Sequence, residues 1–220
     1  MPQQTFFNLP AEKQAAILAL AIEEFAEHTY KTASISRIVA RAGIAKGSFY
    51  QYFADKKDLY LYLLEMITQE KTQFFQQNAP PTAEMGIFAY IRWLLDVGVR
   101  FEFTNPQLAQ IGYRAMYGDA PLPLETKAVL QQGMLPYFRQ LVEQGQEQGV
   151  LTANIDPDVA AFMFNAVFSN LGDYLLRRLA VAPEALLHEE KNRLAAPEAQ
   201  LIFEQILSIL ESGMGTKGTI

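Results

Sequence analysis

The chain has 220 residues, of which 50% are hydrophobic and 19% are charged, and it contains no cysteine. This composition suffices for a substantial core and excludes a disordered chain, while the lack of cysteine excludes a disulfide framework, a thiolate zinc site and a cysteine nucleophile. The longest apolar run, Ala15–Ile22, has eight residues against the roughly 20 that a membrane-spanning helix needs, so we expect a cytoplasmic protein without a membrane partner.

Helical periodicity runs through the chain, and neither alternating strands nor hairpin turn signals occur. In the first expected helix, for example, Ile17, Ala21 and Phe25 share one face. Gly43 tolerates the left-handed conformation that ends a helix, and Asp156 followed by Pro157 supplies an N-cap and a first-turn proline. We therefore expect an all-α protein with helices over about 10–28, 34–42, 45–53, 56–75, 83–104, 107–117, 124–148, 157–179 and 197–211.

Several local expectations follow from single residues. Ser34 and Asp55 are expected to cap the helices that they precede. Pro136 falls inside the expected helix over 124–148 and predicts a kink there. The tail from Ser212 contains three glycines and is expected to fray. The acid pair Glu23-Glu24 is expected to lie on a solvated helix face.

Positive charge is concentrated in one short stretch of an otherwise acidic chain. The net charge is −6, yet residues 28–57 contain six Lys or Arg and a single acid, Asp55. A basic island in an acidic protein indicates a site for a polyanion, although a chance cluster on a solvated face would have the same composition. The charge pattern alone leaves both interpretations open.

Residues 34–53 form two short expected helices joined by a tight turn at Gly43. Ile38, Ile44, Phe49 and Phe53 are spaced to form a small core with the first helix. This layout predicts a helix-turn-helix, in which the second helix lies in the major groove of DNA. An ordinary helical hairpin with polar outer faces is the competing interpretation.

The sequence Gly-Ile-Ala-Lys-Gly-Ser-Phe-Tyr-Gln-Tyr-Phe over 43–53, followed by Asp-Lys-Lys-Asp-Leu over 55–59, resembles the signature of the TetR family of bacterial repressors. That signature reads Gly-Val-Ser-Lys-Gly-Thr-Leu-Tyr-x-Tyr-Phe, then Lys-Glu-x-Leu. The resemblance implies a three-helix DNA-binding domain over 1–55, followed by a helical-bundle domain over 56–220 for ligand binding and dimerisation. It also implies a double-stranded DNA operator, a homodimer and a small-molecule effector as partners, with no cofactor.

The resemblance assigns DNA contacts residue by residue. It places phosphate contacts at the start of the first short helix, base or phosphate contacts on the second, and a backbone anchor at the start of the helix that follows. The residues are Ser34, Ser36, Lys46, Gly47, Ser48, Tyr50, Gln51, Tyr52 and Lys56. Three departures from the family stand out: Val39 replaces a small alanine, Ser36 replaces a common arginine, and the chain has no basic N-terminal arm.

The second domain contains aromatic and charged residues that could line a ligand pocket, because such pockets are mostly apolar with a few placed polar groups. The candidates are Phe74, Arg92, Trp93, Asp96, Tyr113, Arg114, Tyr117 and Tyr137. For the aromatic residues, core packing is the competing interpretation. Arg92, Asp96 and Arg100 recur every four residues, so they form either an ion-pair row or an anchor for an acidic group of the effector.

The family resemblance places the dimer contact on the last two large helices. Apolar residues on these helices form stripes wide enough to serve both core and partner. The residues are Ala161, Phe164, Asn165, Phe168, Leu171, Leu175, Ile202, Phe203, Ile206, Leu207 and Leu210.

An enzyme is not expected. The two histidines, His28 and His188, have no metal-ligand spacing, so no metal site is predicted, and neither a Gly-x-Ser-x-Gly elbow nor a phosphate-binding glycine loop occurs. The prediction is a ligand-responsive transcriptional regulator, most simply a repressor released from a palindromic operator by a small apolar or aromatic effector. The alternative is an all-helical small-molecule binding protein that does not read DNA.

Overall fold

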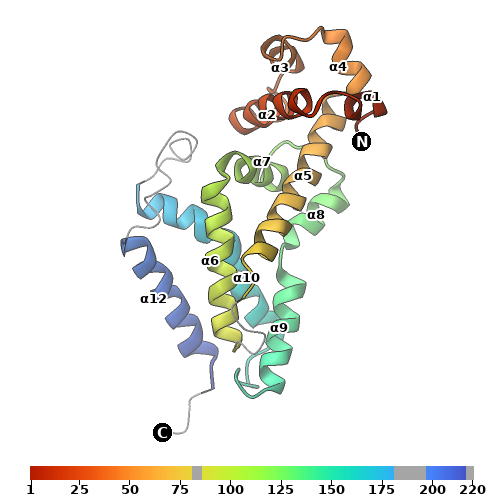
Figure 1. Cartoon of the computed structure of the whole chain (residues 1–220). Helices are drawn as coiled ribbons and strands as arrows, with labels where there is room; N and C mark the ends of the chain where they lie inside the picture. The colour runs from red at the N-terminus through yellow and green to blue at the C-terminus, as the bar shows by residue number, and fades with distance from the viewer. Residues whose placement is uncertain (81–85, 181–196, 217–220) are drawn as a thin grey trace. The chain divides into compact units, whose positions relative to one another are not determined.

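The structure is a computed structural model of the whole chain, and it describes residues 1–80, 86–180 and 197–216 (Figure 1). Within these ranges the chain is helical and has no strand, which confirms the all-α expectation. The chain forms two compact units. The first unit comprises Met1–Phe74 and Asn105–Lys127, and the second comprises Phe75–Thr104 and the chain from Ala128 onward.

The first unit extends beyond the 1–55 range expected for a DNA-binding domain, because most of α5 and the whole of α7 belong to it. Its helices are α1 (Gln4–Phe7), α2 (Ala11–Glu27), α3 (Ile35–Arg41), α4 (Lys46–Tyr52), α5 (Lys56–Gln77, whose last residues belong to the second unit) and α7 (Pro106–Tyr117). Helix α1 has only four residues and no helical periodicity in the sequence, so it was not predicted.

The ends of these helices follow the expected capping chemistry. The Ser34 hydroxyl accepts the N–H of Arg37 at 3.4 Å at the start of α3, and the Asp55 carboxylate accepts the N–H of Asp58 at 2.8 Å at the start of α5. Gly43 has φ +63° in the turn between α3 and α4. A side chain at this position would be strained in the left-handed region, so the glycine fixes where α3 ends.

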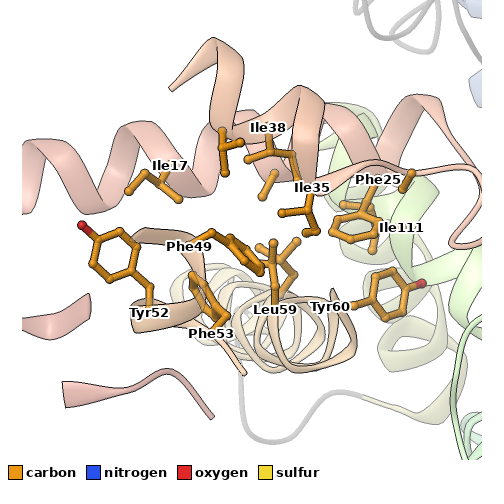
Figure 2. Close-up of a cluster of buried hydrophobic side chains, with 14 of the residues drawn as sticks. Ile17, Phe25, Ile35, Ile38, Phe49, Tyr52, Phe53, Leu59, Tyr60 and Ile111 are labelled. Carbon is orange, nitrogen blue, oxygen red and sulfur yellow. The ribbon is translucent and has the colours of Figure 1, made fainter. Parts of the chain in front are cut away.

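The core of the first unit lies between α2, the two short helices and the start of α5. Figure 2 shows labelled side chains of α2, α3, α4 and α5 converging, with Ile111 of α7 joining them. Phe25, Phe49, Phe53 and Leu59 are each at most 1% exposed. Burying a side chain of this size contributes about 1.5–3 kcal/mol, so this packing sets the orientation of α3 and α4.

The second unit is a separate helical bundle. It contains α6 (Ile87–Thr104), most of α8 (Leu124–Gln132), α9 (Leu135–Glu147), α10 (Pro157–Arg178) and α12 (Pro197–Met214). Its core includes Ile91, Phe138 and Phe164. The N-terminus of α10 is capped as expected, since the Asp156 carboxylate accepts the N–H groups of Asp158 and Val159.

Two expectations about the second unit are wrong. The helix over 124–148 does not kink at Pro136 but breaks at Gly133, which has φ +54°, so that Pro136 sits in the first turn of α9 where its missing N–H is not needed. The tail from Ser212 does not fray at once, because α12 continues to Met214 and the N–H of Thr216 donates to the Val150 carbonyl at 3.0 Å.

The apolar stripes of α10 and α12 divide into a buried part and an exposed part. Six residues that were expected to serve both core and partner lie in the core of the second unit: Ala161, Phe164, Leu171, Leu175, Leu207 and Leu210. A separate set of apolar side chains on the same two helices is exposed to between 42% and 71%: Val159, Phe162, Met163, Tyr174, Leu201 and Ile209.

One described helix, α10, is long and apolar enough by length and composition to cross a membrane, a property that the length of unbroken apolar runs did not reveal. Core helices also meet this criterion. Ala161, Phe164 and Leu171 of α10 are buried in the second unit.

Candidate nucleic-acid interface

Helix α4 has one buried face and one exposed face. Phe49 is fully buried and Tyr52 is 8% exposed, so both point into the core of the first unit. Lys46, Gly47 and Gln51 are exposed, and Tyr50 is 52% exposed. The outer face of α4 thus presents a cation, an amide and a phenol, from Lys46, Gln51 and Tyr50. An aromatic ring that stays exposed on a short amphipathic helix is available to a partner.

Helix α3 presents a second polar surface beside α4. Ile35, Ile38 and Val39 are buried, whereas Ser36 is exposed and Ser34 is half-buried at the N-cap. The Ser34 hydroxyl therefore has a structural role, as the sequence predicted, in addition to the DNA contact assigned to it.

Glu24 on α2 holds the start of α3 through hydrogen bonds to its carboxylate. It is 3% exposed, and its carboxylate accepts the N–H of Ser34 at 2.7 Å and the Nε–H of Arg37 at 3.0 Å. Burial raises the pKa of Glu24, but the hydrogen bonds from Arg37 and Ser34 outweigh it and leave the pKa below its ordinary value. The expectation that Glu23-Glu24 forms a solvated face is therefore wrong for Glu24, which is a buried, charged tie between two helices.

Three of the six cations in the basic island over residues 28–57 form ion pairs or hydrogen bonds within the protein. Arg37 is paired with Glu24, and Arg41 is paired with Glu23. The ammonium of Lys56 donates to the carbonyls of Tyr30 at 2.7 Å and Ala33 at 3.0 Å. The remaining cations of the island, Lys31, Lys46 and Lys57, are exposed.

Lys56 lies at the linker between α2 and α3 rather than on an outward face. Besides its two shorter bonds it donates to the Lys31 carbonyl at 3.3 Å, and its Nζ lies 4.6 Å from the centre of the Tyr30 ring. This ammonium therefore stabilises the linker, whereas the sequence assigned it to the DNA backbone. Tyr52, also assigned to DNA, points its ring into the core.

The segment that follows α7 also holds the linker between α2 and α3. The Asp119 carboxylate accepts the N–H groups of Tyr30 and Lys31, both at 2.9 Å. Burial acts to raise the pKa of Asp119, but the backbone N–H of Lys31 and further hydrogen bonds lower it overall. Arg114 of α7 donates to the Phe25 carbonyl at 3.1 Å at the end of α2, so α7 contributes directly to the position of the helix-turn-helix.

The eight candidate ligand residues fall into different units. Arg92, Trp93, Asp96 and Tyr137 belong to the second unit. In the first unit, Tyr113 is 53% exposed, Phe74 is half-buried, and Arg114 bonds to the Phe25 carbonyl; the side chain of Tyr117 lies outside the described set. The structure therefore divides the eight candidates equally between the two units.

An aromatic group in the second unit centres on Tyr90, which sequence reasoning did not select. The Tyr90 ring centroid lies 5.1 Å from that of Trp93, and its hydroxyl is hydrogen-bonded to the Tyr137 hydroxyl. The Trp93 indole N–H donates to the Asn78 carbonyl at 2.6 Å. Burial and the bond to Tyr90 raise the pKa of Tyr137, so this phenol stays neutral and able to donate.

The charged row on α6 is only partly self-paired. Arg100 pairs with Asp96 at 2.9 Å, as the ion-pair interpretation predicted, whereas Arg92 pairs with Glu204 of α12. Each partner is at least 41% exposed. Among the residues that the structure describes, no cluster of three or more His, Asp or Glu could hold a metal ion.

Comparison with known families matches both parts of the chain. Residues 17–63 match the family described as bacterial regulatory proteins, tetR family, and residues 85–215 match the family described as tetracyclin repressor-like, C-terminal domain. The first match contains α3, α4 and the start of α5, and the second begins just before α6.

Individual relatives agree with these matches. A solved structure of a TetR family transcriptional regulator from Chloroflexus aurantiacus is 52% identical, covers 99% of this chain and 100% of its own, and has a TM-score of 0.87. An HTH-type transcriptional repressor of Streptomyces coelicolor is 30% identical over 162 residues, which are 72% of this chain and 77% of that protein. The A-factor receptor protein of Streptomyces griseus is 27% identical over 71% of this chain but only 52% of its own length.

Proposed function

The chain belongs to the TetR family of bacterial transcriptional regulators, and we propose that it is a homodimeric repressor that binds a near-palindromic operator and is released from it by a small apolar or aromatic effector. Membership of the family makes it a DNA-binding regulator and not an enzyme. The observation that carries the proposal is the outer face of α4, where Lys46, Tyr50 and Gln51 are exposed above a fully packed inner face.

The geometry of α4 suits the major groove, which is about 12 Å wide and admits one helix. Lys46 supplies charge to a phosphate, while the Gln51 amide can both donate to and accept from a base edge. Tyr50 adds a phenol, and Gly47 and Ser48 allow close approach of the first turn. Ser36 at the start of α3 is exposed on the flank, where the first helix of the motif crosses the backbone.

A dimer follows from the need for two half-sites. One recognition helix reads a few base pairs, and specific binding by a helix-turn-helix uses two, one helical turn of DNA apart. The exposed apolar side chains of α10 and α12 supply the surface for self-association, with Phe162 and Ile209 exposed to 60% and 71%. Exposed large apolar groups gathered on two helices are typical of an interface.

The effector is proposed to bind near the aromatic group of the second unit. Tyr90, Trp93 and Tyr137 together offer stacking surfaces and neutral hydroxyls, which favours an aromatic or apolar molecule. The Arg100 guanidinium, half-exposed in its pair with Asp96, offers a partner for one acidic group.

Selection of DNA by the protein tests the DNA-binding part of the proposal. The wild-type chain is incubated with a random double-stranded library, and the retained sequences are determined. We expect an enriched sequence made of two inverted half-sites, bound by two chains in a gel shift. Tyr50→Ala should weaken binding to this sequence more than tenfold. Retention of random sequence only, or a single chain on one half-site at full affinity, would contradict the proposal.

A linkage measurement tests the effector. Compounds are screened for an increase in the melting temperature of the dimer, and the affinity of each hit is measured with and without the selected operator. A ligand that releases the repressor must bind more weakly in the presence of operator, by the same factor by which it weakens DNA binding. Trp93→Ala should abolish the effect of the ligand without changing operator affinity. Equal ligand affinities in both titrations would contradict release by that ligand.

A further inference from the structure

The segment that precedes α2 contacts the C-terminal end of α4. The backbone N–H of Gln3 donates to the Tyr52 carbonyl at 2.8 Å, and the Thr5 hydroxyl donates to the Gln51 carbonyl. The last four carbonyls of a helix have no partner within it. Residues from the start of the chain therefore supply donors to the final turn of α4.

Apolar packing holds the same segment in place. Phe6 is fully buried, and its ring centroid lies 5.0 Å from that of Phe53 and 6.1 Å from that of Tyr52. On its other side, the Gln14 amide of α2 donates to the Leu9 carbonyl at 2.8 Å. The segment is thus fixed between the start of α2 and the end of α4.

Helix α4 depends on such neighbours because it has only seven residues. An isolated helix shorter than about 12 residues is marginal in water. The exposed side chains of Tyr50 and Gln51 occupy the same turn whose carbonyls accept from Gln3 and Thr5. A shift of this turn would move both side chains relative to the bases.

We propose that residues 3–9 form a brace that fixes the last turn of α4 in the position needed to read DNA, with Gln3 and Phe6 as positioning residues. This inference rests on the proposed DNA-binding role of α4. The brace acts through α4 and not by contact with DNA, because residues 3–9 contain no Lys or Arg and so offer no side-chain cation to phosphates.

The brace affects specific binding and leaves non-specific binding unchanged. Non-specific affinity comes from cations on phosphates, and the brace carries none. Base contacts, in contrast, require hydrogen-bond geometry at the end of α4. Loosening the brace is therefore expected to lower the ratio of specific to non-specific affinity at an unchanged salt slope.

A matched pair of substitutions at Gln3 tests the contact of its backbone N–H with the Tyr52 carbonyl. Gln3 has φ −73°, which proline adopts, so Gln3→Pro removes the N–H donor at a compatible backbone angle. The proline ring carbon also takes the place of the amide hydrogen against the Tyr52 carbonyl, so the substitution breaks this contact completely. Gln3→Ala keeps the N–H and removes only an exposed side chain. Affinity is measured for the sequence that the wild-type chain selects from a random library and for an unrelated duplex of equal length.

We expect Gln3→Pro to bind the selected sequence at least roughly threefold to tenfold more weakly per subunit, because the loss of one hydrogen bond has that effect and the proline ring adds a steric conflict. Binding to the unrelated duplex and the salt slope should stay unchanged, and Gln3→Ala should match wild type. Wild-type behaviour of Gln3→Pro would overturn the proposal. An equal loss in Gln3→Ala would indicate direct contact of the side chain with DNA, and an equal loss on both duplexes would indicate general unfolding; either result also overturns it.

Phe6 provides an independent test. Phe6→Ala should lose specific affinity more strongly than Gln3→Pro, and Phe6→Leu should restore most of it. Phe25→Ala is the control, because Phe25 is also buried in the same core but packs on Tyr30 and Tyr60. If the Phe25→Ala and Phe6→Ala variants lowered the ratio of specific to non-specific affinity equally at matched melting temperatures, the brace would be refuted.

The failure of the brace can be distinguished from failure of the proposed function. If Lys46→Ala and Tyr50→Ala weaken operator binding but Gln3→Pro does not, only the brace fails. If the wild-type chain selects no sequence, the DNA-binding role fails and the brace fails with it.

Discussion

The Glu24 carboxylate on α2 accepts the Nε–H of Arg37 on α3, with 3.0 Å from Nε to each carboxylate oxygen. The same carboxylate accepts the N–H of Ser34, the residue that caps α3. One buried charge thus satisfies both a helix N-terminus and a guanidinium. The orientation of α3 relative to α2 depends on this contact as well as on apolar packing.

Glu24→Gln should therefore destabilise the protein, whereas Glu23→Gln should not. Removing the buried charge weakens its hydrogen bonds to Ser34 and Arg37, and bonds to a charged group contribute about 1.5–3 kcal/mol. The neighbouring pair of Glu23 with Arg41 is exposed and contributes less than about 1 kcal/mol. Urea denaturation of both variants measures the difference; equal free energies of unfolding would show that Glu24 is not an anchor.

The stability of the protein should also fall in acid because of Glu24. Its pKa in the folded state is below the ordinary value of 4.5, so its contribution is present above that pH and is lost as the pH falls through the folded pKa. The lowered pKa of Asp119 acts in the same direction, below its ordinary value of 3.8. Denaturation from pH 6 to about pH 3 should show a steeper decline for wild type than for Glu24→Gln; parallel curves would contradict the assignment.

The sequence predicted the helix-turn-helix because its local signals agree with one another. Gly43 ends α3, Ser34 caps it, and Ile38, Phe49 and Phe53 have the spacing of an inward face. The same agreement located the starts of α5 and α10. These features depend on contacts within a few residues, which sequence patterns report well.

The remaining features depend on contacts between distant segments. Burial of Glu24 follows from its partner Arg37, thirteen positions away, and the role of Phe6 follows from Phe53. The membership of α7 in the first unit follows from bonds such as Arg114 to the Phe25 carbonyl. Nothing in the local pattern around these residues indicates their partners.

Tyr60→Phe is expected to stabilise the protein. Tyr60 is 2% exposed, and its hydroxyl has no hydrogen-bond partner among the described residues. Burial, together with the charge of Asp119, raises the pKa of this phenol to about 12. Removal of a buried, unpaired hydroxyl should raise the free energy of unfolding by about 1 kcal/mol.

Tyr137→Phe serves as the opposite control for this prediction. The Tyr137 hydroxyl is bonded to Tyr90, so its loss should lower the free energy of unfolding by about 1 kcal/mol. Calorimetry of the two variants measures both changes in the free energy of unfolding, which should have opposite signs. A destabilised Tyr60→Phe would indicate that the hydroxyl of Tyr60 has a partner.

We expect substitution of Lys56 to affect the stability of the protein, and substitution of its neighbour Lys57 to affect DNA binding. Lys56→Met removes an ammonium bonded to the carbonyls of Tyr30 and Ala33, so we expect a loss of about 2 kcal/mol in stability. Lys57 is exposed, and Lys57→Met should leave stability within about 0.5 kcal/mol but flatten the salt dependence of DNA binding. If Lys56→Met instead flattened the salt slope at unchanged stability, Lys56 would be a DNA phosphate contact, as the family resemblance assigned it, and not a stabiliser of the linker.

The salt dependence of operator binding by wild type, Lys46→Ala and Arg139→Ala tests the central claim most directly. Arg139 lies on α9 and is half-exposed, so Arg139→Ala removes one positive charge from the second unit, to which the proposed interface does not belong. The slope of log affinity against log salt concentration should flatten by about one unit per subunit in Lys46→Ala and stay unchanged in Arg139→Ala. Identical slopes for wild type and Lys46→Ala would contradict the placement of α4 on DNA.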